Sequence, residues 1–135
     1  PGLVIAALAA DTNPSMRITL VESDARKCAF LTTAAREMGI EVKVLTSRIE
    51  ALARARRDVI SARALARLPK LLELAEMQAG PGTICLFPKG AGAASELTEA
   101  ARDWHIRYRT HPSVTDPHAV VLELQEFSRV HHDRT

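Results

Sequence analysis

Residues 105–124, HIRYRTHPSVTDPHAVVLEL, contain two runs rich in β-branched and aromatic side chains, separated by a loop with two prolines. The runs, at residues 105–110 and 118–124, predict two strands with no helix between them. Two consecutive strands that lack a crossover helix should pair antiparallel. Many doubly wound sheets end instead in one more strand–helix unit, so this ending narrows the choice of fold.

Upstream of residue 105, predicted strands alternate with predicted helices. Apolar and β-branched runs predict strands at residues 17–22, 41–45, 58–62 and 83–87. Apolar stripes and capping residues predict helices at residues 3–8, between Ser23-Asp24 and Gly39, and at residues 47–50, 68–75 and 94–104. This order indicates fold class α/β: a mostly parallel sheet with helices on both faces and an antiparallel last strand.

The composition is that of an ordinary globular domain. The 135 residues are 47% hydrophobic and 25% charged, with a net charge of +2. We expect one domain at residues 1–126 and a polar tail at residues 127–135. No apolar run is long enough to cross a bilayer, no secretory leader is visible, and neither Cys28 nor Cys85 has a Cys-x-x-Cys neighbour. These features predict a reduced, cytoplasmic protein.

The chain begins without Met and in a helical pattern, which predicts that further sequence precedes Pro1. We expect the first strand of the sheet to lie in that preceding sequence. In this topology that strand would lie between the strands that end at Glu22 and Ala62. Its absence would leave two unpaired strand edges.

The first candidate site residue is Glu22, because ligands of such sheets bind at the carboxyl ends of the strands. Glu22 ends a predicted strand, and a carboxylate there can accept hydrogen bonds from both hydroxyls of a ribose. The alternative is a structural role, in which Glu22 supplies a favourable charge at the start of the helix near Asp24.

Ser47-Arg48-Ile49-Glu50 follows the second predicted strand. Ile49 could cover the face of an adenine while backbone amides at the helix start read its edge. Arg48 could face an RNA phosphate or the substrate base. The alternative is a plain capping box, since Ser-x-x-Glu is its signature.

Two basic residues follow the third and fourth predicted strands. Arg63 would be a fixed charge on the floor of the cleft, and the alternative is a structural ion pair. Lys89 precedes Gly90, which would let backbone approach a ligand; the alternative is an ordinary turn with an exposed lysine. Between residues 48 and 70, seven basic residues occur against two acids. This segment favours phosphate binding or a solvated helix face.

Two other functional classes share part of this pattern. An NAD-dependent oxidoreductase would share the sheet and the acid at Glu22, but it should carry a Tyr-x-x-x-Lys pair. The single tyrosine, Tyr108, is instead followed four residues on by Pro112. A non-catalytic nucleotide- or RNA-binding module is the third class. The sequence lacks a Gly-x-Gly-x-x-Gly loop, a Walker loop and an Asn/Asp-Pro-Pro-Tyr/Phe motif, and His111 and His118 lack metal-ligand spacing.

Five short motifs occur in order along the chain. They are Pro1-Gly2-Leu3, Val21-Glu22-Ser23-Asp24-Ala25-Arg26-Lys27 with Phe30-Leu31, Ser47-Arg48-Ile49-Glu50, Ser61-Ala62-Arg63-Ala64 and Lys89-Gly90. The first resembles the end of a loop of the form Gly-x-Gly-x-Gly-Phe-Pro-Gly. Together, up to about Leu124, they resemble the bacterial small-subunit ribosomal RNA guanine-N7 methyltransferases, also called glucose-inhibited division protein B.

This resemblance implies a Rossmann-like class I fold with S-adenosylmethionine as cofactor, no metal, and a guanine of 16S rRNA or of the small ribosomal subunit as substrate. It also implies that Ile49 and Glu50 contact the adenosine part of the cofactor, that Arg63 lies at the cofactor and substrate site, and that Arg48 lies in the active cleft. With Glu22 and Lys89 added from their places after the strands, we expect Glu22, Ile49, Glu50 and Arg63 to bind the cofactor and Arg48, Arg63 and Lys89 to be catalytic.

The chain departs from the family pattern in two places. The first strand and the rest of the glycine-rich loop, which would hold the methionine part of the cofactor, are not in the sequence. Some relatives also carry an arginine near the start of the last strand, where this chain has Pro117-His118.

Overall fold

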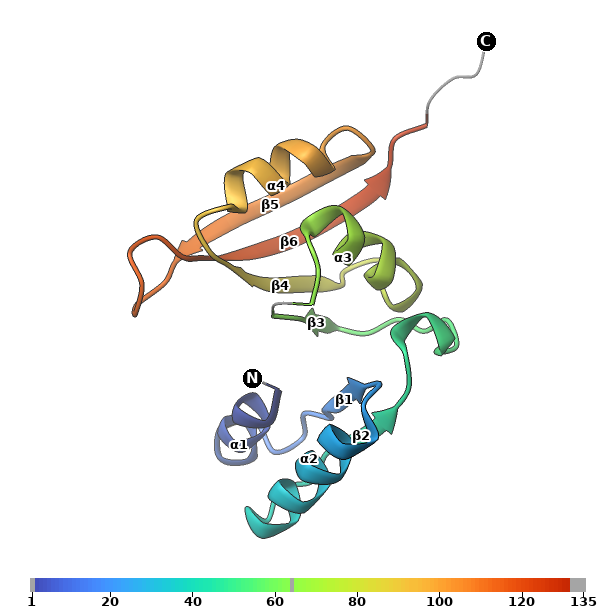
Figure 1. The fold of residues 1–135 in the computed structure, drawn as a ribbon, viewed down its shortest axis with the longest axis vertical. Helices are drawn as coiled ribbons and strands as arrows, with labels where there is room; N and C mark the ends of the chain where they lie inside the picture. Colours follow the sequence, from blue (N-terminus) through green and yellow to red (C-terminus); the bar gives the residue numbers. More distant parts are fainter. Residues whose placement is uncertain (1, 64, 132–135) are drawn as a thin grey trace. The chain divides into compact units, whose positions relative to one another are not determined.

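A computed structural model describes residues 2–63 and 65–131 (Figure 1). The chain divides into two compact units, Pro1–Leu52 and Ala53–Thr135. Each unit has its own sheet, and each is described by itself below. None of the described helices is long and apolar enough to span a membrane.

The first unit contains a pair of parallel strands and two α-helices. Its elements are α1 (Gly2–Thr12), β1 (Thr19–Glu22), α2 (Ala25–Glu37), β2 (Lys43–Thr46) and the 3₁₀ helix η1 (Ile49–Ala51). β1 and β2 pair in parallel, with Glu22 opposite Thr46 at their carboxyl ends. α2 connects the two strands, as a crossover between parallel neighbours requires.

The start of α2 confirms the predicted cap. The Asp24 carboxylate accepts hydrogen bonds from the amides of Arg26 and Lys27, at 2.8 and 3.4 Å. Gly39, with φ at +68°, follows the helix in the left-handed conformation that glycine adopts without strain.

The spacing of Cys28, Leu31, Thr32, Ala35 and Met38 predicts a buried stripe on α2, and the face that is actually buried is narrower. Cys28 and Ala35 are buried. Thr32 is exposed and donates a hydrogen bond from its hydroxyl to the Cys28 carbonyl, and 51% of Met38 is exposed. The prediction that Thr32 and Met38 are buried is therefore wrong for this unit.

The second unit contains a four-stranded sheet covered by two helices. Its elements are β3 (Val59–Ser61), α3 (Leu68–Ala75), η2 (Glu76–Gln78), β4 (Ile84–Lys89), α4 (Ala93–Ala100), β5 (Trp104–Pro112) and β6 (Val120–Arg129). The strand order is β3-β4-β6-β5. β3 and β4 are parallel, and β6 is antiparallel to both of its neighbours, β4 and β5. The predicted antiparallel last strand is confirmed.

The core of the second unit lies between the sheet and the helices α3 and α4 (Figure 1). The apolar stripe of α3 is buried, with at most 6% of any of its residues exposed, and Pro69 lies in the first turn of the helix. The stripe consists of Leu68, Leu71, Leu72 and Ala75. It packs against Phe87 and Cys85 of β4 and Leu122 and Leu124 of β6, all of which are at most 1% exposed.

The last strand is longer than the predicted strand at residues 118–124. β6 continues to Arg129, into the segment expected to be a polar tail. Two contacts hold this extension: the rings of Trp104 and Phe127 lie 5.7 Å apart, and the Arg129 guanidinium lies 4.7 Å from the centre of the Trp104 ring. Arg129 also forms an ion pair with Glu76 at 2.9 Å. Residues 132–135 of the expected tail lie outside the described residues.

Two predicted boundaries in the second unit are wrong. α4 ends at Ala100, and Trp104 begins β5 rather than ending a helix, because it pairs with Arg129. β4 runs through Pro88 to Lys89, where a break was expected. β3 pairs with β4 only as far as Leu86, so at Pro88 the strand has one neighbour and the missing N–H need not interrupt a ladder.

Each unit contains one pair of parallel strands. β1 pairs with β2, and β3 pairs with β4; no strand within residues 2–63 and 65–131 pairs with both β1 and β3. This pairing agrees with the expectation of one unpaired edge at β1 and another at β3.

Candidate functional site

In the first unit, two candidate segments lie side by side at one edge of the parallel pair. Glu22 is the last residue of β1, and the segment 47–50 follows β2 directly. The Ser47 amide donates a hydrogen bond to the Glu22 carbonyl at 3.0 Å. This bond extends the ladder by one residue and brings Glu22 next to the segment that carries Arg48, Ile49 and Glu50.

The Glu22 side chain is half-buried and uses one of its two carboxylate oxygens within the unit. Its Oε1 accepts a hydrogen bond from the Asp24 amide at 3.1 Å. Its Oε2 has no hydrogen-bond partner among the described residues. The structural role that the sequence left open is therefore real, and it leaves one oxygen available to a ligand.

The segment that follows β2 is not a capping box. The Ser47 hydroxyl donates to the Arg48 carbonyl at 2.8 Å instead of accepting from an amide further on. Arg48 occupies the N-cap position of η1, so Glu50 is its second residue, whereas a capping box needs the acid at the third. Arg48 and Glu50 are exposed and Ile49 is half-buried.

In the second unit, Arg63 lies in the connection between β3 and α3, which spans residues 62–67. Its side chain is exposed, and no hydrogen bond or ion pair joins it to another residue in the described part of the chain. The structural ion pair that the sequence left open for Arg63 is not found there.

Arg48 and Arg63 differ from the other basic residues between 48 and 70 in their lack of side-chain hydrogen bonds and ion pairs among the described residues. The other five interact through hydrogen bonds or ion pairs. They are Arg54, Arg56, Arg57, Arg67 and Lys70. Among the described residues, Arg48 and Arg63 alone in this segment have no such partner, so their charges remain available to an anion.

The alternative interpretation of Lys89, an exposed lysine in an ordinary turn, is wrong, because Lys89 is the last residue of β4 and its side chain is nearly buried. Its side chain is 9% exposed and its ammonium lies 3.0 Å from the Glu96 carboxylate. The ammonium also donates to the Ala66 carbonyl at 2.8 Å. An ammonium has three N–H donors, and these two contacts use two of them.

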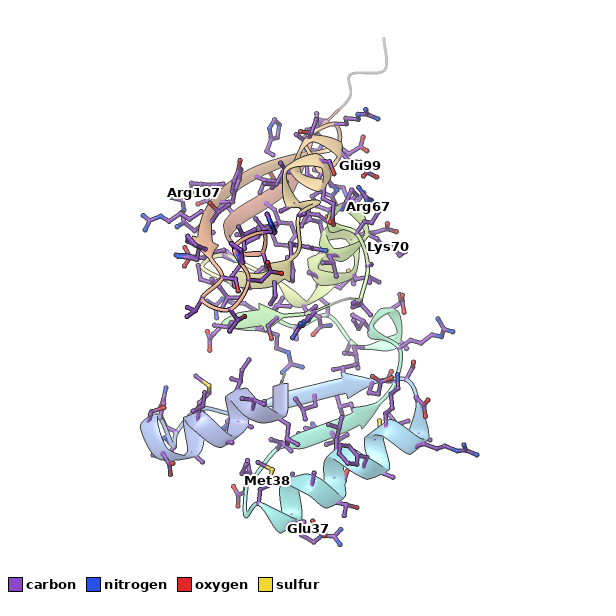
Figure 2. All side chains as sticks on the ribbon, turned by 60° about the vertical axis from the view of Figure 1, so that its left-hand side comes forward. Glu37, Met38, Arg67, Lys70, Glu99 and Arg107 are labelled. Atoms are coloured by element: carbon purple, nitrogen blue, oxygen red, sulfur yellow. The ribbon has the colours of Figure 1, made fainter. Side chains whose placement is uncertain are left out.

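Glu96 is a buried acid that the sequence analysis missed. Its side-chain Oε1 accepts a hydrogen bond from the Leu68 amide, at 2.8 Å, in addition to pairing with Lys89. Its position in the first turn of α4, between the buried alanines Ala93 and Ala100, is the sequence feature that could have indicated its burial. Close by, Arg67 and Glu99, both labelled in Figure 2, form an exposed ion pair at 2.8 Å.

The six predicted site residues therefore form two sets. Glu22, Arg48, Ile49 and Glu50 belong to the first unit, and Arg63 and Lys89 belong to the second. Within each set, the residues lie at or just after the carboxyl ends of parallel strands. This edge is where sheets of this type bind ligands.

The cysteines carry no feature of a nucleophile or a metal site. Both are free and buried. Burial raises the pKa of the Cys85 thiol to about 12, so it stays protonated at neutral pH. Within the described residues, no group of three or more His, Cys, Asp or Glu side chains could hold a metal ion.

The sequence matches one protein family over most of its length. The family model described as rRNA small subunit methyltransferase G matches residues 1–124. A ribosomal RNA small subunit methyltransferase G from Cereibacter sphaeroides is 51% identical over 130 residues, which cover 96% of this chain and 63% of the relative. The chain thus spans slightly less than two thirds of the length of that curated relative.

Solved structures share the fold at low sequence identity. A putative methyltransferase from Thermoplasma acidophilum superposes with a TM-score of 0.63 at 12% identity, covering 91% of this chain and 63% of that one. The S-adenosylmethionine-dependent methyltransferase SibL also gives 0.63, at 17% identity, with 92% of this chain and 48% of that one covered. These similarities confirm the predicted class I methyltransferase fold.

Proposed function

This chain belongs to the rRNA small subunit methyltransferase G family, and we propose that it forms the greater part of an enzyme that methylates N7 of a guanine in 16S ribosomal RNA. The methyl donor in this proposal is S-adenosylmethionine. The observation that carries the proposal is the family match over residues 1–124. Family membership favours methyl transfer over hydride transfer or non-catalytic binding.

We assign the adenosine part of the cofactor to the first unit. The Asp24 amide occupies Oε1 of Glu22, and its Oε2 can accept hydrogen bonds from ribose hydroxyls, which supports this assignment. Ile49 presents a half-buried apolar side chain on the neighbouring segment, which suits an adenine face. Glu50, which lies on the same segment, and Arg63 complete the four residues that we assign to the cofactor.

The second unit and Arg48 supply the positive charge that an RNA substrate needs. Arg63 and Arg48 are exposed and have no partner among the described residues, so either guanidinium can bind a phosphate or donate to guanine O6. We assign the third N–H donor of the Lys89 ammonium to the same purpose. RNA affinity should then fall as salt concentration rises, since these groups replace condensed counterions.

The proposed reaction requires that guanine N7 be aligned with the methyl group, and it does not require a general base. When bound, S-adenosylmethionine supplies an electrophilic methyl group on a sulfonium sulfur. Guanine N7 has an in-plane lone pair and carries no proton, so no residue has to remove one. We assign Arg63, Arg48 and Lys89 to holding the base in line and to stabilising the charge that develops on it.

The partner in this proposal is 16S rRNA or the small ribosomal subunit, and the target base is unstacked before it reacts. Because ribosomal subunits are assembled in the bacterial cytoplasm, we place the enzyme there. No membrane and no metal ion take part in the proposed reaction.

Calorimetry with two cofactors tests the proposed class. The complete gene product is titrated with S-adenosylmethionine and, separately, with NAD. We expect saturable binding of S-adenosylmethionine and none of NAD. Binding of NAD alone would replace the methyltransferase proposal with the oxidoreductase alternative.

A further inference from the structure

Glu96 occupies an unusual position for an acid, because it lies on the apolar face of its helix. It is 8% exposed and lies between Ala93 and Ala100, which are also buried. An ionised carboxylate is almost never buried unless it is paired and hydrogen-bonded. The role of Glu96 in the fold therefore follows from the groups that bind its carboxylate.

Those contacts join three separate elements. Glu96 of α4 accepts a hydrogen bond from the Leu68 amide, at the start of α3, and pairs with Lys89 at the end of β4. Lys89 in turn donates to the Ala66 carbonyl, two residues before α3 begins. Lys89 and Glu96 thus bind the backbone of Ala66 and of Leu68, where the connection between β3 and α3 ends and the helix begins.

The near end of the same connection is held by the sheet. β3 pairs with β4 up to Ser61, opposite Leu86. The described residues of this connection, 62–63 and 65–67, thus follow a strand paired with β4 at one end. At the other end, Lys89 of β4 binds the Ala66 carbonyl and Glu96 of α4 binds the Leu68 amide. Arg63 lies within this span and has no anchor of its own among the described residues.

We propose that Glu96 is a positioning residue for Arg63: together with Lys89, it fixes the connection between β3 and α3 so that the guanidinium is held at the reacting guanine. This inference rests on the proposed function, because Arg63 acts on substrate only if the chain is the proposed methyltransferase. Glu96 itself touches neither substrate nor cofactor. In a purely structural role, Glu96 would pair with Lys89 and bind the start of α3 without affecting the position of Arg63.

A double-mutant cycle separates positioning from structure. In the complete gene product, Glu96→Gln is combined with Arg63→Lys, and kcat and KM for 16S rRNA are measured. We expect Glu96→Gln to lower kcat about tenfold when Arg63 is present, since small misplacements are costly. In the Arg63→Lys background, we expect it to lower kcat less than about twofold. Equal losses in both backgrounds would overturn the proposal.

Two further variants serve as a second test of Glu96 and as a control. Glu96→Asp keeps the negative charge but is one methylene shorter, so it cannot reach Leu68 and Lys89 together; we expect a loss of kcat like that of Glu96→Gln. Glu73→Gln removes the acid of the exposed Lys70–Glu73 pair in the same unit. This control should leave kcat unchanged.

Amide hydrogen exchange tests the anchor without relying on activity. We expect Glu96→Gln and Glu96→Asp to speed exchange at Leu68 and in residues 65–67, while Glu73→Gln does not. Unchanged exchange in both Glu96 variants would overturn the anchor, even in an active enzyme. Faster exchange in a protein that transfers no methyl group would retain the anchor and refute the proposed function and, with it, the role of Arg63.

Discussion

The Glu22 carboxylate and the Asp24 amide are joined by a 3.1 Å hydrogen bond, so two acids at the end of β1 have different tasks. Asp24 caps α2 with its side chain and donates to Glu22 with its backbone. Glu22 receives that bond on one oxygen and keeps the other free among the described residues. Substitutions of these two residues can therefore be compared, because Glu22 is assigned to cofactor binding and the Asp24 side chain stabilises α2.

Replacing Glu22 with Gln should weaken binding of S-adenosylmethionine about tenfold. The amide is neutral, and charge-assisted hydrogen bonds to ribose hydroxyls contribute about 1.5–3 kcal/mol. Asp24→Ala is the control: it should cost about 1 kcal/mol of folding stability through the lost cap and leave the affinity unchanged. Calorimetric titration and thermal unfolding of both variants check this; equal affinities for Glu22→Gln and the wild type would remove Glu22 from the site.

Replacing Arg63 with Ala should abolish methyl transfer and leave folding intact. The side chain is exposed and unpaired among the described residues, so we expect a change in unfolding free energy within about 0.5 kcal/mol. Methylation assays and thermal unfolding of the complete gene product measure the two effects. Normal turnover by Arg63→Ala would show that another group acts at the guanine.

Replacing Lys89 with Met should destabilise the fold by about 3 kcal/mol, because it leaves the nearly buried Glu96 carboxylate without its counter-charge. Lys70→Met provides a contrast, since its ion pair with Glu73 is about half exposed on both sides and such pairs are worth about 0–1 kcal/mol. Chemical denaturation of both variants gives the two values. Similar losses would mean that the Lys89–Glu96 pair is not effectively buried.

Cys85 should make the protein less stable at alkaline pH. Its pKa is raised from 9.0 to about 12 in the folded state, so above pH 9 the unfolded chain loses a proton that the folded chain retains. Stability should then fall between pH 9 and about 12, by up to about 1.4 kcal/mol per pH unit. In Cys85→Ala this contribution should vanish, and denaturation at several pH values compares the slopes. Identical slopes would contradict the raised pKa.

The closing strands could be predicted from the sequence because the decisive feature is local. Two β-rich runs with a short loop and no helix between them can hardly pair in parallel, and β5 and β6 are antiparallel as expected. The boundary before them was misplaced, since Leu97, Ala101 and Trp104 follow a helical spacing. Pairing of Trp104 with Arg129 overrides that local pattern.

The candidate site was predictable where it depends on strand ends and unpredictable where it depends on distant partners. Glu22 and Ser47 come together because β1 and β2 are parallel, which the alternation of elements predicts. The burial of Lys89 depends on Glu96, and the two meet only in the folded second unit. Likewise, Ser47 and Glu50 match a capping box in spacing, but η1 begins too late for it.

The proposed methyl transfer is tested by incubating the complete gene product with S-adenosylmethionine and either bare 16S rRNA or small ribosomal subunits, and then mapping the methylated atom. We expect methylation of a guanine at N7. Absence of transfer to both substrates, or a methyl group on a different atom or base, would contradict the proposal.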